Sequence, residues 1–160
     1  MIQSFVGDKM IVTFCGHRDF FHAKQYEEKL VAFLIMLASK NEFLDCYCGG
    51  YGQFDDFAAR CAKSAKKISA NIRCFLIIPY ITTDHQNRLK YIRDHYDGII
   101  YPPLEKVPYR LAIIRRNEWM IDNADIVVSY VDHSWGGAAK TLAYAKKKKK
   151  FIFQLIKPTS

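Results

Sequence analysis

Two glycine-rich turns in the sequence have the composition of phosphate-binding loops. Gly49, Gly50 and Gly52 fall within four residues, between an apolar run and an amphipathic segment, and Gly136 and Gly137 repeat the arrangement later in the chain. Glycine lets a backbone turn tightly and approach a ligand, and the N-terminus of a helix offers unpaired N–H groups to an anion. A short glycine motif also suits an ordinary tight turn, so spacing alone leaves both interpretations open. The presence of two such turns favours a ligand site.

Two carboxylates, Asp55 and Asp56, follow the first glycine turn. Acidic residues in the first turn of a helix complement its dipole. They could also contact a ribose hydroxyl, or act as acid or base at an anomeric carbon. We expect the dipole role for Asp56 and the ligand role for Asp55. If the protein is an enzyme, these two residues are its candidate catalytic groups.

Several other residues are candidate ligand contacts. An arginine directly after a strand can present a fork of donors to a phosphate. An asparagine on an apolar helix face, as Asn117 is expected to be between Ile113, Ile114 and Ile121, needs hydrogen-bond partners. No spacing of metal ligands and no nucleophile–histidine–acid arrangement is present, so neither a metal nor a cofactor is expected. The expected contacts beyond the first glycine turn are Gly16, Arg18, Arg116, Asn117, Asp132, Gly136 and Gly137.

These residues are placed by alternating strands and helices. The expected strands are 10–15, 43–48, 73–79, 98–101, 125–131 and 151–156. The expected helices are 23–39, an apolar stripe from Phe54 to Ile68, 85–96, 109–123, and one that begins at the second glycine turn. Apolar strands that alternate with helices predict an α/β, Rossmann-like, doubly wound and mainly parallel sheet with helices on both faces. Ligands bind at the carboxyl ends of such strands, which selects the loops 16–19, 49–54, 79–84 and 132–137.

Length and composition limit the class of protein. A chain of 160 residues fits one domain, 1–160. The longest apolar run, 30–38, has nine residues, whereas a membrane span needs about 20. No basic segment followed by an apolar stretch and a cleavage site begins the chain, so a cytoplasmic protein is expected. Five cysteines without a C-x-x-C pair predict free, buried thiols.

The net charge of +8 is only weak evidence for a nucleic-acid partner. Five of the positive charges come from the lysine run 146–150. Lysines at the end of a helix are favoured by its dipole and usually lie on a solvated face. We therefore expect a small-molecule partner, neither nucleic acid nor membrane, and leave a homo-oligomer open.

The motifs together resemble the SLOG superfamily of Rossmann-like proteins, and specifically its small bacterial members. The matching stretches are T-F-C-G-H-R (13–18), G-G-Y-G-Q-F-D (49–55), I-I-P (77–79), R-N-E-W-M-I-D-N-A-D (116–125) and G-G-A-A-K-T-L-A-Y-A (136–145). The resemblance implies a doubly wound sheet with a pocket for a nucleotide or a nucleotide-derived ligand, used in sensing as well as in catalysis. Binding or sensing of such a ligand is therefore the expected function.

Three relatives within this group imply alternative functions. The first glycine turn is similar to the P-G-G-x-G-T-x-x-E motif of Lonely Guy phosphoribohydrolases, which implies an N-glycosidic hydrolase, but Asp56 replaces the catalytic glutamate. A residue one methylene shorter changes catalytic reach. The last third resembles nucleoside deoxyribosyltransferases, except that Thr141 stands where that family has its glutamate nucleophile. Similarity to DprA implies binding of single-stranded DNA.

Overall fold

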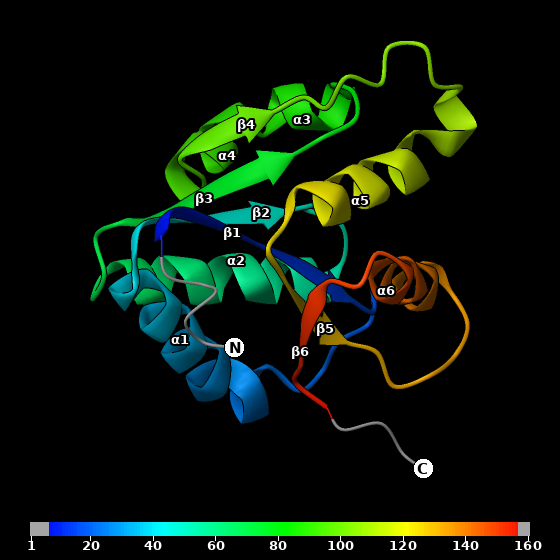
Figure 1. Cartoon of the computed structure of the whole chain (residues 1–160). Helices are drawn as coiled ribbons and strands as arrows, with labels where there is room; N and C mark the ends of the chain where they lie inside the picture. Colours follow the sequence, from blue (N-terminus) through cyan, green and yellow to red (C-terminus); the bar gives the residue numbers. More distant parts are fainter. Residues whose placement is uncertain (1–6, 157–160) are drawn as a thin grey trace.

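The computed structural model describes residues 7–156, and within them six parallel strands form one sheet (Figure 1). The strand order is β4-β3-β2-β1-β5-β6. The strands are β1 (Gly7–Gly16), β2 (Asn41–Cys48), β3 (Ile72–Ile77), β4 (Gly98–Ile100), β5 (Ile126–Tyr130) and β6 (Phe151–Gln154). The predicted α/β, Rossmann-like fold with a parallel sheet is confirmed, and each expected strand is present within a few residues of its predicted bounds.

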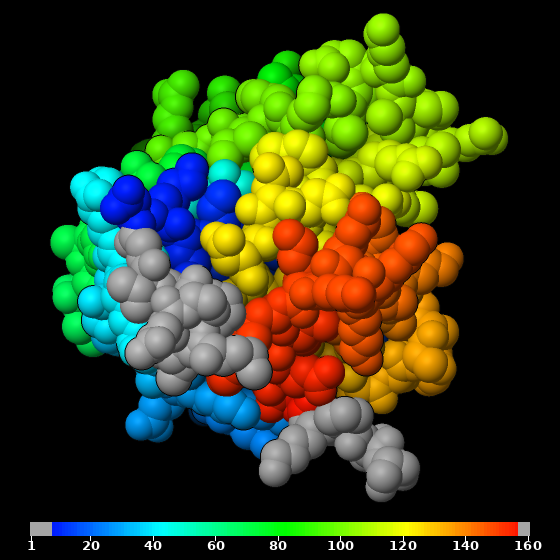
Figure 2. All heavy atoms as spheres, in the orientation of Figure 1, coloured from blue at the N-terminus to red at the C-terminus, as the bar shows by residue number. Residues whose placement is uncertain are grey.

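Helices cover both faces of the sheet because successive strand residues point to opposite sides. Val12 and Phe14 pack toward α1 (Ala23–Ser39) and α2 (Gln53–Lys66). Cys15, the residue after Phe14, packs on the other face against Leu142 of α6 (Gly137–Lys147). Figure 2 shows α6 beside α5 (Ala112–Asn123) on this second face, and the two helices contact each other.

The order of the strands reverses between β1 and β5. From β1 the chain proceeds outward through β2 and β3 to β4, and then it crosses back to β5 and β6. The last register pair of the two central strands is Gly16 with Tyr130. The loops that follow these residues leave in opposite directions, which opens a crevice at their carboxyl ends, where ligands of doubly wound sheets bind.

Three sequence-based expectations about helices are corrected. The helix expected over 85–96 is two short ones, α3 (Thr83–Asn87) and α4 (Leu89–His95), since Thr82 starts a helix earlier through a capping box with His85 and the chain leaves helical geometry at Arg88. The helix expected over 109–123 begins with the 3-10 turn η2 (Tyr109–Leu111). Ile68 lies beyond the end of α2 and is 72% exposed instead of completing the apolar stripe.

The five cysteines are free and buried, as expected. No helix within residues 7–156 is long and apolar enough to cross a membrane. The expected domain, 1–160, and the expected lack of an export signal extend over residues 1–6 and 157–160, which lie outside the described part of the chain.

Candidate functional site

Two adjacent cavities lie at the carboxyl ends of the strands. The first, here the switch-point cavity, has a volume of about 380 Å³ and lies between the loop after β1, α5 and the start of α6. The second, here the β3-side cavity, has a volume of about 350 Å³ and lies between the turn after β2, the end of β3 and the segment that holds α3 and α4. Tyr51, Ile113 and Arg116 line both. Each volume is in the range of small-molecule sites.

Most of the predicted site residues line one or both of these cavities. The switch-point cavity is lined by Gly16, Arg18, Asp55, Arg116, Asn117, Gly136 and Gly137. The β3-side cavity is lined by Gly49, Gly50, Asp56 and Arg116. Two predicted residues line neither one: Asp132 faces a third pocket together with His133, and Gly52 is the N-cap of α2. All of them therefore lie along one edge of the sheet.

The first glycine turn is filled by the protein's own atoms. Gly50 and Gly52 have φ angles of 67° and 96°, which favour glycine. A Cβ at Gly50 would lie 2.5 Å from Leu76 Cδ1, and one at Gly52 would lie 2.8 Å from Arg18 Cα. The Tyr51 N–H donates to Asp55 Oδ2 over 2.8 Å. Close packing and the Asp55 carboxylate thus occupy much of the space and one of the N–H groups that a phosphate would need at this turn. In the sequence, this turn is nevertheless the stronger of the two phosphate motifs.

The second glycine turn is open. Gly136 has a φ angle of 93°, and a Cβ added at Gly136 or at Gly137 would meet nothing within 4 Å. The N-terminus of α6 carries no side-chain cap and no acidic residue in its first turn. Both glycines line the switch-point cavity. The positive end of the helix dipole and unpaired N–H groups are therefore available to an anion there.

Two arginines border the switch-point cavity and differ in their surroundings. Arg18 is exposed, and its guanidinium makes no hydrogen bond or ion pair with the residues from 7 to 156. Arg116 is 2% exposed, and its Nη1 donates to the carbonyls of Gly49 and Ile77 over 2.8 and 2.9 Å. Burial lowers the pKa of Arg116, and the negative charge of Asp55 opposes this shift. Arg18 is free to bind an anion, whereas Arg116 connects α5 to the turn after β2 and to the end of β3.

The expectation for Asn117 is corrected in the same region. Arg116, and not Asn117, occupies the buried polar position of α5, while the partly buried Asn117 accepts a hydrogen bond from Arg116 Nε over 2.9 Å. Ile114, expected on the apolar face, is 49% exposed. The buried residues Ala112, Arg116 and Met120 recur every four positions, so helical spacing counted from Met120 would have found Arg116.

Asp55 is the carboxylate with the most perturbed ionisation in the site. Burial raises its pKa from 3.8 to about 6, against the opposing effects of the Tyr51 N–H and of Arg116. A carboxyl group with such a pKa exchanges protons near neutral pH, as general acids and bases must.

We expect this carboxyl group to make stability depend on pH. Because its pKa is higher in the folded state, the folded state binds more protons between pH 4 and 6, and stability falls as the pH rises through this window. The wild type should lose about 1 to 3 kcal/mol of unfolding free energy from this group between pH 4 and 7. Urea unfolding of the wild type and of Asp55→Asn at each pH checks this. A difference between the two proteins that does not change with pH would contradict it.

A stack of two histidine rings, not predicted from the sequence, lies beside the cavity. The His17 side chain, 8% exposed, stacks on the His133 ring with centroids 3.6 Å apart, and His133 in turn packs against Trp135. His17 Nε2 accepts a hydrogen bond from the Asp132 N–H over 2.9 Å. Burial and the His133 ring lower the pKa of His17, opposed by Asp132. His17 and His133 are 116 positions apart in the chain, and no local spacing connects them.

The sequence matches no known protein family and no curated protein. Solved structures do resemble its fold. DprA from Streptococcus pneumoniae matches with a TM-score of 0.63 at 15% identity over 93% of this chain and 53% of its own. DprA from Helicobacter pylori, which binds single-stranded DNA, matches with 0.62 at 19% identity over 91% of this chain and 64% of its own. The chain thus spans about half to two thirds of these proteins.

A third similar structure is the molybdenum cofactor carrier protein from Chlamydomonas reinhardtii. Its TM-score is 0.56 at 17% identity, over 91% of this chain and 76% of its own. At such identities the likeness concerns the fold alone. The neighbours include a protein that binds single-stranded DNA and a cofactor carrier, so they do not support the expectation of a small-molecule partner in preference to nucleic acid.

Proposed function

We propose that the protein binds a nucleotide or a nucleotide-derived ligand in the switch-point cavity, with the ligand's phosphate at the turn Gly136–Gly137. The observation that carries this proposal is the open N-terminus of α6, which neither a cap nor an acidic residue satisfies. Arg18 borders the same cavity with a guanidinium that no described residue engages, and it supplies charge-assisted hydrogen bonds to the phosphate.

The remainder of the ligand has space toward the β3-side cavity. Tyr51 lines both cavities and is 57% exposed. Beyond it, Tyr80 and Tyr109 line the β3-side cavity with ring centroids 4.6 Å apart. Aromatic rings suit the face of a base, and Asp55 suits a ribose hydroxyl. We therefore place the phosphate over the start of α6 and the base toward these tyrosines.

Calorimetric titration with adenosine and guanosine and their mono-, di- and triphosphates tests the proposal. We expect nucleotides to bind and the nucleosides without phosphate to bind at least about 10-fold more weakly, since a charged hydrogen bond contributes about 1.5–3 kcal/mol. Arg18→Ala should lose roughly 10- to 100-fold in affinity, while Arg93→Ala, exposed on α4 away from both cavities, should lose none. Equal affinity of nucleosides and nucleotides would contradict the proposal.

A second candidate is hydrolysis of the N-glycosidic bond of a nucleotide, favoured by the raised pKa of Asp55 beside the cavity. A protonated carboxyl group can donate to a leaving base. In this case incubation with nucleoside monophosphates releases free base, Asp55→Asn abolishes the release, and Asp56→Asn, which lies on the β3-side cavity, reduces it less. If wild type and Asp55→Asn release equal amounts, this candidate fails.

Single-stranded DNA belongs in the same titrations because two of the fold neighbours are DprA proteins. The lysine run 146–150 lies at the opposite end of α6 from Gly137. An eleven-residue helix places it about 16 Å away. Replacing Lys146 to Lys149 with glutamine should therefore leave nucleotide affinity unchanged, and it should reduce the salt dependence of DNA binding only if DNA binds through this run.

A further inference from the structure

We propose that His17, Asp132 and His133 bind one Zn²⁺ ion at the rim of the switch-point cavity. These three residues come from the loops that follow β1 and β5, at the place where the strand order reverses. Two imidazoles and one carboxylate are a ligand set typical of zinc and other divalent transition metals. The proposal depends on these side chains alone and does not rest on the proposed nucleotide function.

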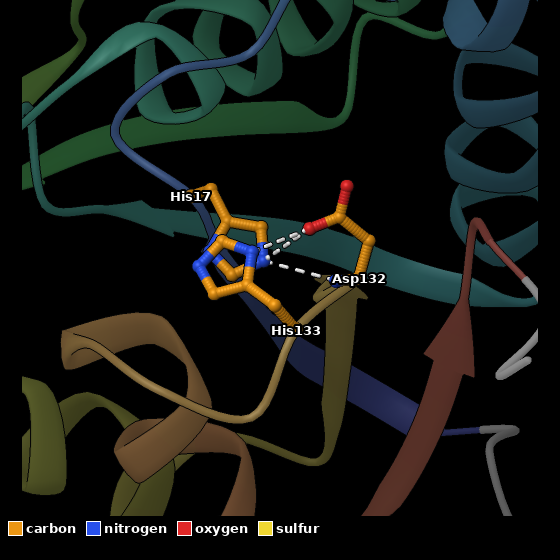
Figure 3. Close-up of side chains that lie close together, drawn as sticks. All are labelled: His17, Asp132 and His133. Atoms are coloured by element: carbon orange, nitrogen blue, oxygen red, sulfur yellow. Dashed lines mark hydrogen bonds and ion pairs between the residues drawn. The ribbon is translucent and has the colours of Figure 1, made fainter.

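The distances within the cluster suit a shared cation. One ligand atom from each residue lies within 4.8 Å of the others (Figure 3). Asp132 Oδ1 is 3.0 Å from His17 Nε2 and 2.7 Å from His133 Nδ1. Donor atoms that share a zinc ion tetrahedrally, with bonds of about 2.0–2.2 Å, lie about 3.3–3.6 Å apart. The cluster therefore comes close to the dimensions of a coordination sphere and needs a small outward movement to admit the ion.

The hydrogen bonds of His17 leave an electrostatic conflict that a cation resolves. Nε2 accepts the backbone N–H of Asp132 over 2.9 Å, so in this arrangement the nitrogen carries no proton on that side. The Asp132 carboxylate oxygen nevertheless lies 3.0 Å from the same nitrogen. Two acceptor atoms at this distance repel each other unless a proton or a metal ion lies between them. A metal ion at Nε2 would replace the N–H as partner and attract both atoms.

Coordination by both rings requires a change at His133. The rings of His17 and His133 are stacked with an interplanar angle of 8°, and a ligand nitrogen binds a metal in the plane of its ring. One of them must therefore turn. His17 is 8% exposed, whereas the side chain of His133 is 28% exposed and lies on a loop, so His133 is the ring that turns. Because His133 packs against Trp135 with centroids 4.1 Å apart, this movement changes the environment of the indole.

Three protein ligands leave at least one position open on a zinc ion. His17 and His133 both line the switch-point cavity, together with Gly136. The Asp132 side chain is 45% exposed, so water reaches the cluster. The open position is thus available to water, or to an oxygen atom of a ligand held at the start of α6.

Titration of the chelator-treated full chain with Zn²⁺, against a chromophoric chelator and with no nucleotide present, tests the site. We expect one Zn²⁺ per chain and a change in Trp135 fluorescence. Asp132→Asn and His133→Gln should each weaken binding about 100-fold or more, since even outer-shell changes cost 10- to 100-fold. His95→Gln, which alters a partly exposed histidine on α4, is the matched control and should bind as the wild type. Trp135→Phe should keep the binding and lose the fluorescence change.

Both ligand variants alter partly exposed side chains, and thermal unfolding without metal verifies that they fold. Absence of Zn²⁺ binding by the wild type, or equal binding by wild type, Asp132→Asn and His133→Gln, would overturn the site. The absorption spectrum of bound Co²⁺ provides a second criterion. Bands that arise only from nitrogen and oxygen ligands support the proposed site. A thiolate charge-transfer band would instead place the metal on the cysteines and overturn it. Because nucleotide is absent, either outcome leaves the proposed nucleotide function to its own titration.

Discussion

Replacing Arg116 with leucine is expected to lower the free energy of unfolding by about 3–5 kcal/mol, the usual cost of removing one member of a buried charged network. The guanidinium donates to the carbonyls of Gly49 and Ile77 and to the Oδ1 of Asn117. The substitution leaves both carbonyls without this donor, and unpaired buried groups cost about 1–3 kcal/mol each. It also removes a positive charge that favours ionised Asp55. Urea unfolding measures the loss.

Two further variants separate the geometry of Arg116 from its charge. Arg116→Lys keeps the charge but cannot reproduce the fork of donors, so we expect a loss between those of the wild type and the leucine variant. Arg115→Met removes a neighbouring arginine that is 52% exposed and pairs with Glu118 over 3.3 Å. Such a surface pair contributes about 0.2–1 kcal/mol. Equal denaturant midpoints for Arg116→Leu and Arg115→Met would show that the buried network contributes nothing.

Gly137→Val is expected to reduce nucleotide affinity about 100-fold or more while changing the free energy of unfolding by less than about 1 kcal/mol. Gly137 has no positive φ angle, and a Cβ there would meet no protein atom within 4 Å. The added side chain therefore fits the folded protein. It occupies the space over the N-terminus of α6 where we place the phosphate. Calorimetric titration and urea unfolding of the same preparation measure the two quantities.

Ala143→Val is the matched control for this variant, because it adds a β-branched side chain at an exposed position of the same helix. It should bind nucleotide as the wild type does. Gly50→Val would be harder to interpret, since its φ angle of 67° and the 2.5 Å approach of Leu76 predict a loss of stability. Wild-type affinity in Gly137→Val would place the phosphate elsewhere.

The sheet was predictable because each buried strand is a short apolar run that ends in a turn. Phe14 and Cys15 are both buried although they point to opposite faces, which is possible only where helices cover both sides of the sheet. The same pattern located the loops at the carboxyl ends of the strands. The division of 83–95 into α3 and α4 was harder to predict. It depends on a capping box between Thr82 and His85, and the segment has a single buried residue, Ile92, so it lacks an apolar pattern.

The site itself was only partly predictable. The sequence placed two glycine turns on one edge, but which turn is open depends on Leu76 and Arg18, whose positions follow from packing. The cluster of His17, Asp132 and His133 forms only when β1 and β5 pair, and no short-range spacing shows it. The importance of Arg116 was hidden because an arginine on a helix is usually exposed.

Amide chemical shifts measured during a titration with a nucleoside monophosphate locate the bound phosphate. We place the phosphate over the start of α6, in the switch-point cavity. In ¹⁵N–¹H spectra we predict that the largest shifts occur at the amides of Gly136, Gly137 and Ala138, with smaller shifts at Gly49 and Gly50. Shifts that are largest at Gly49 and Gly50 and leave Gly137 unchanged, or no shifts at saturating nucleotide, would contradict this position of the phosphate.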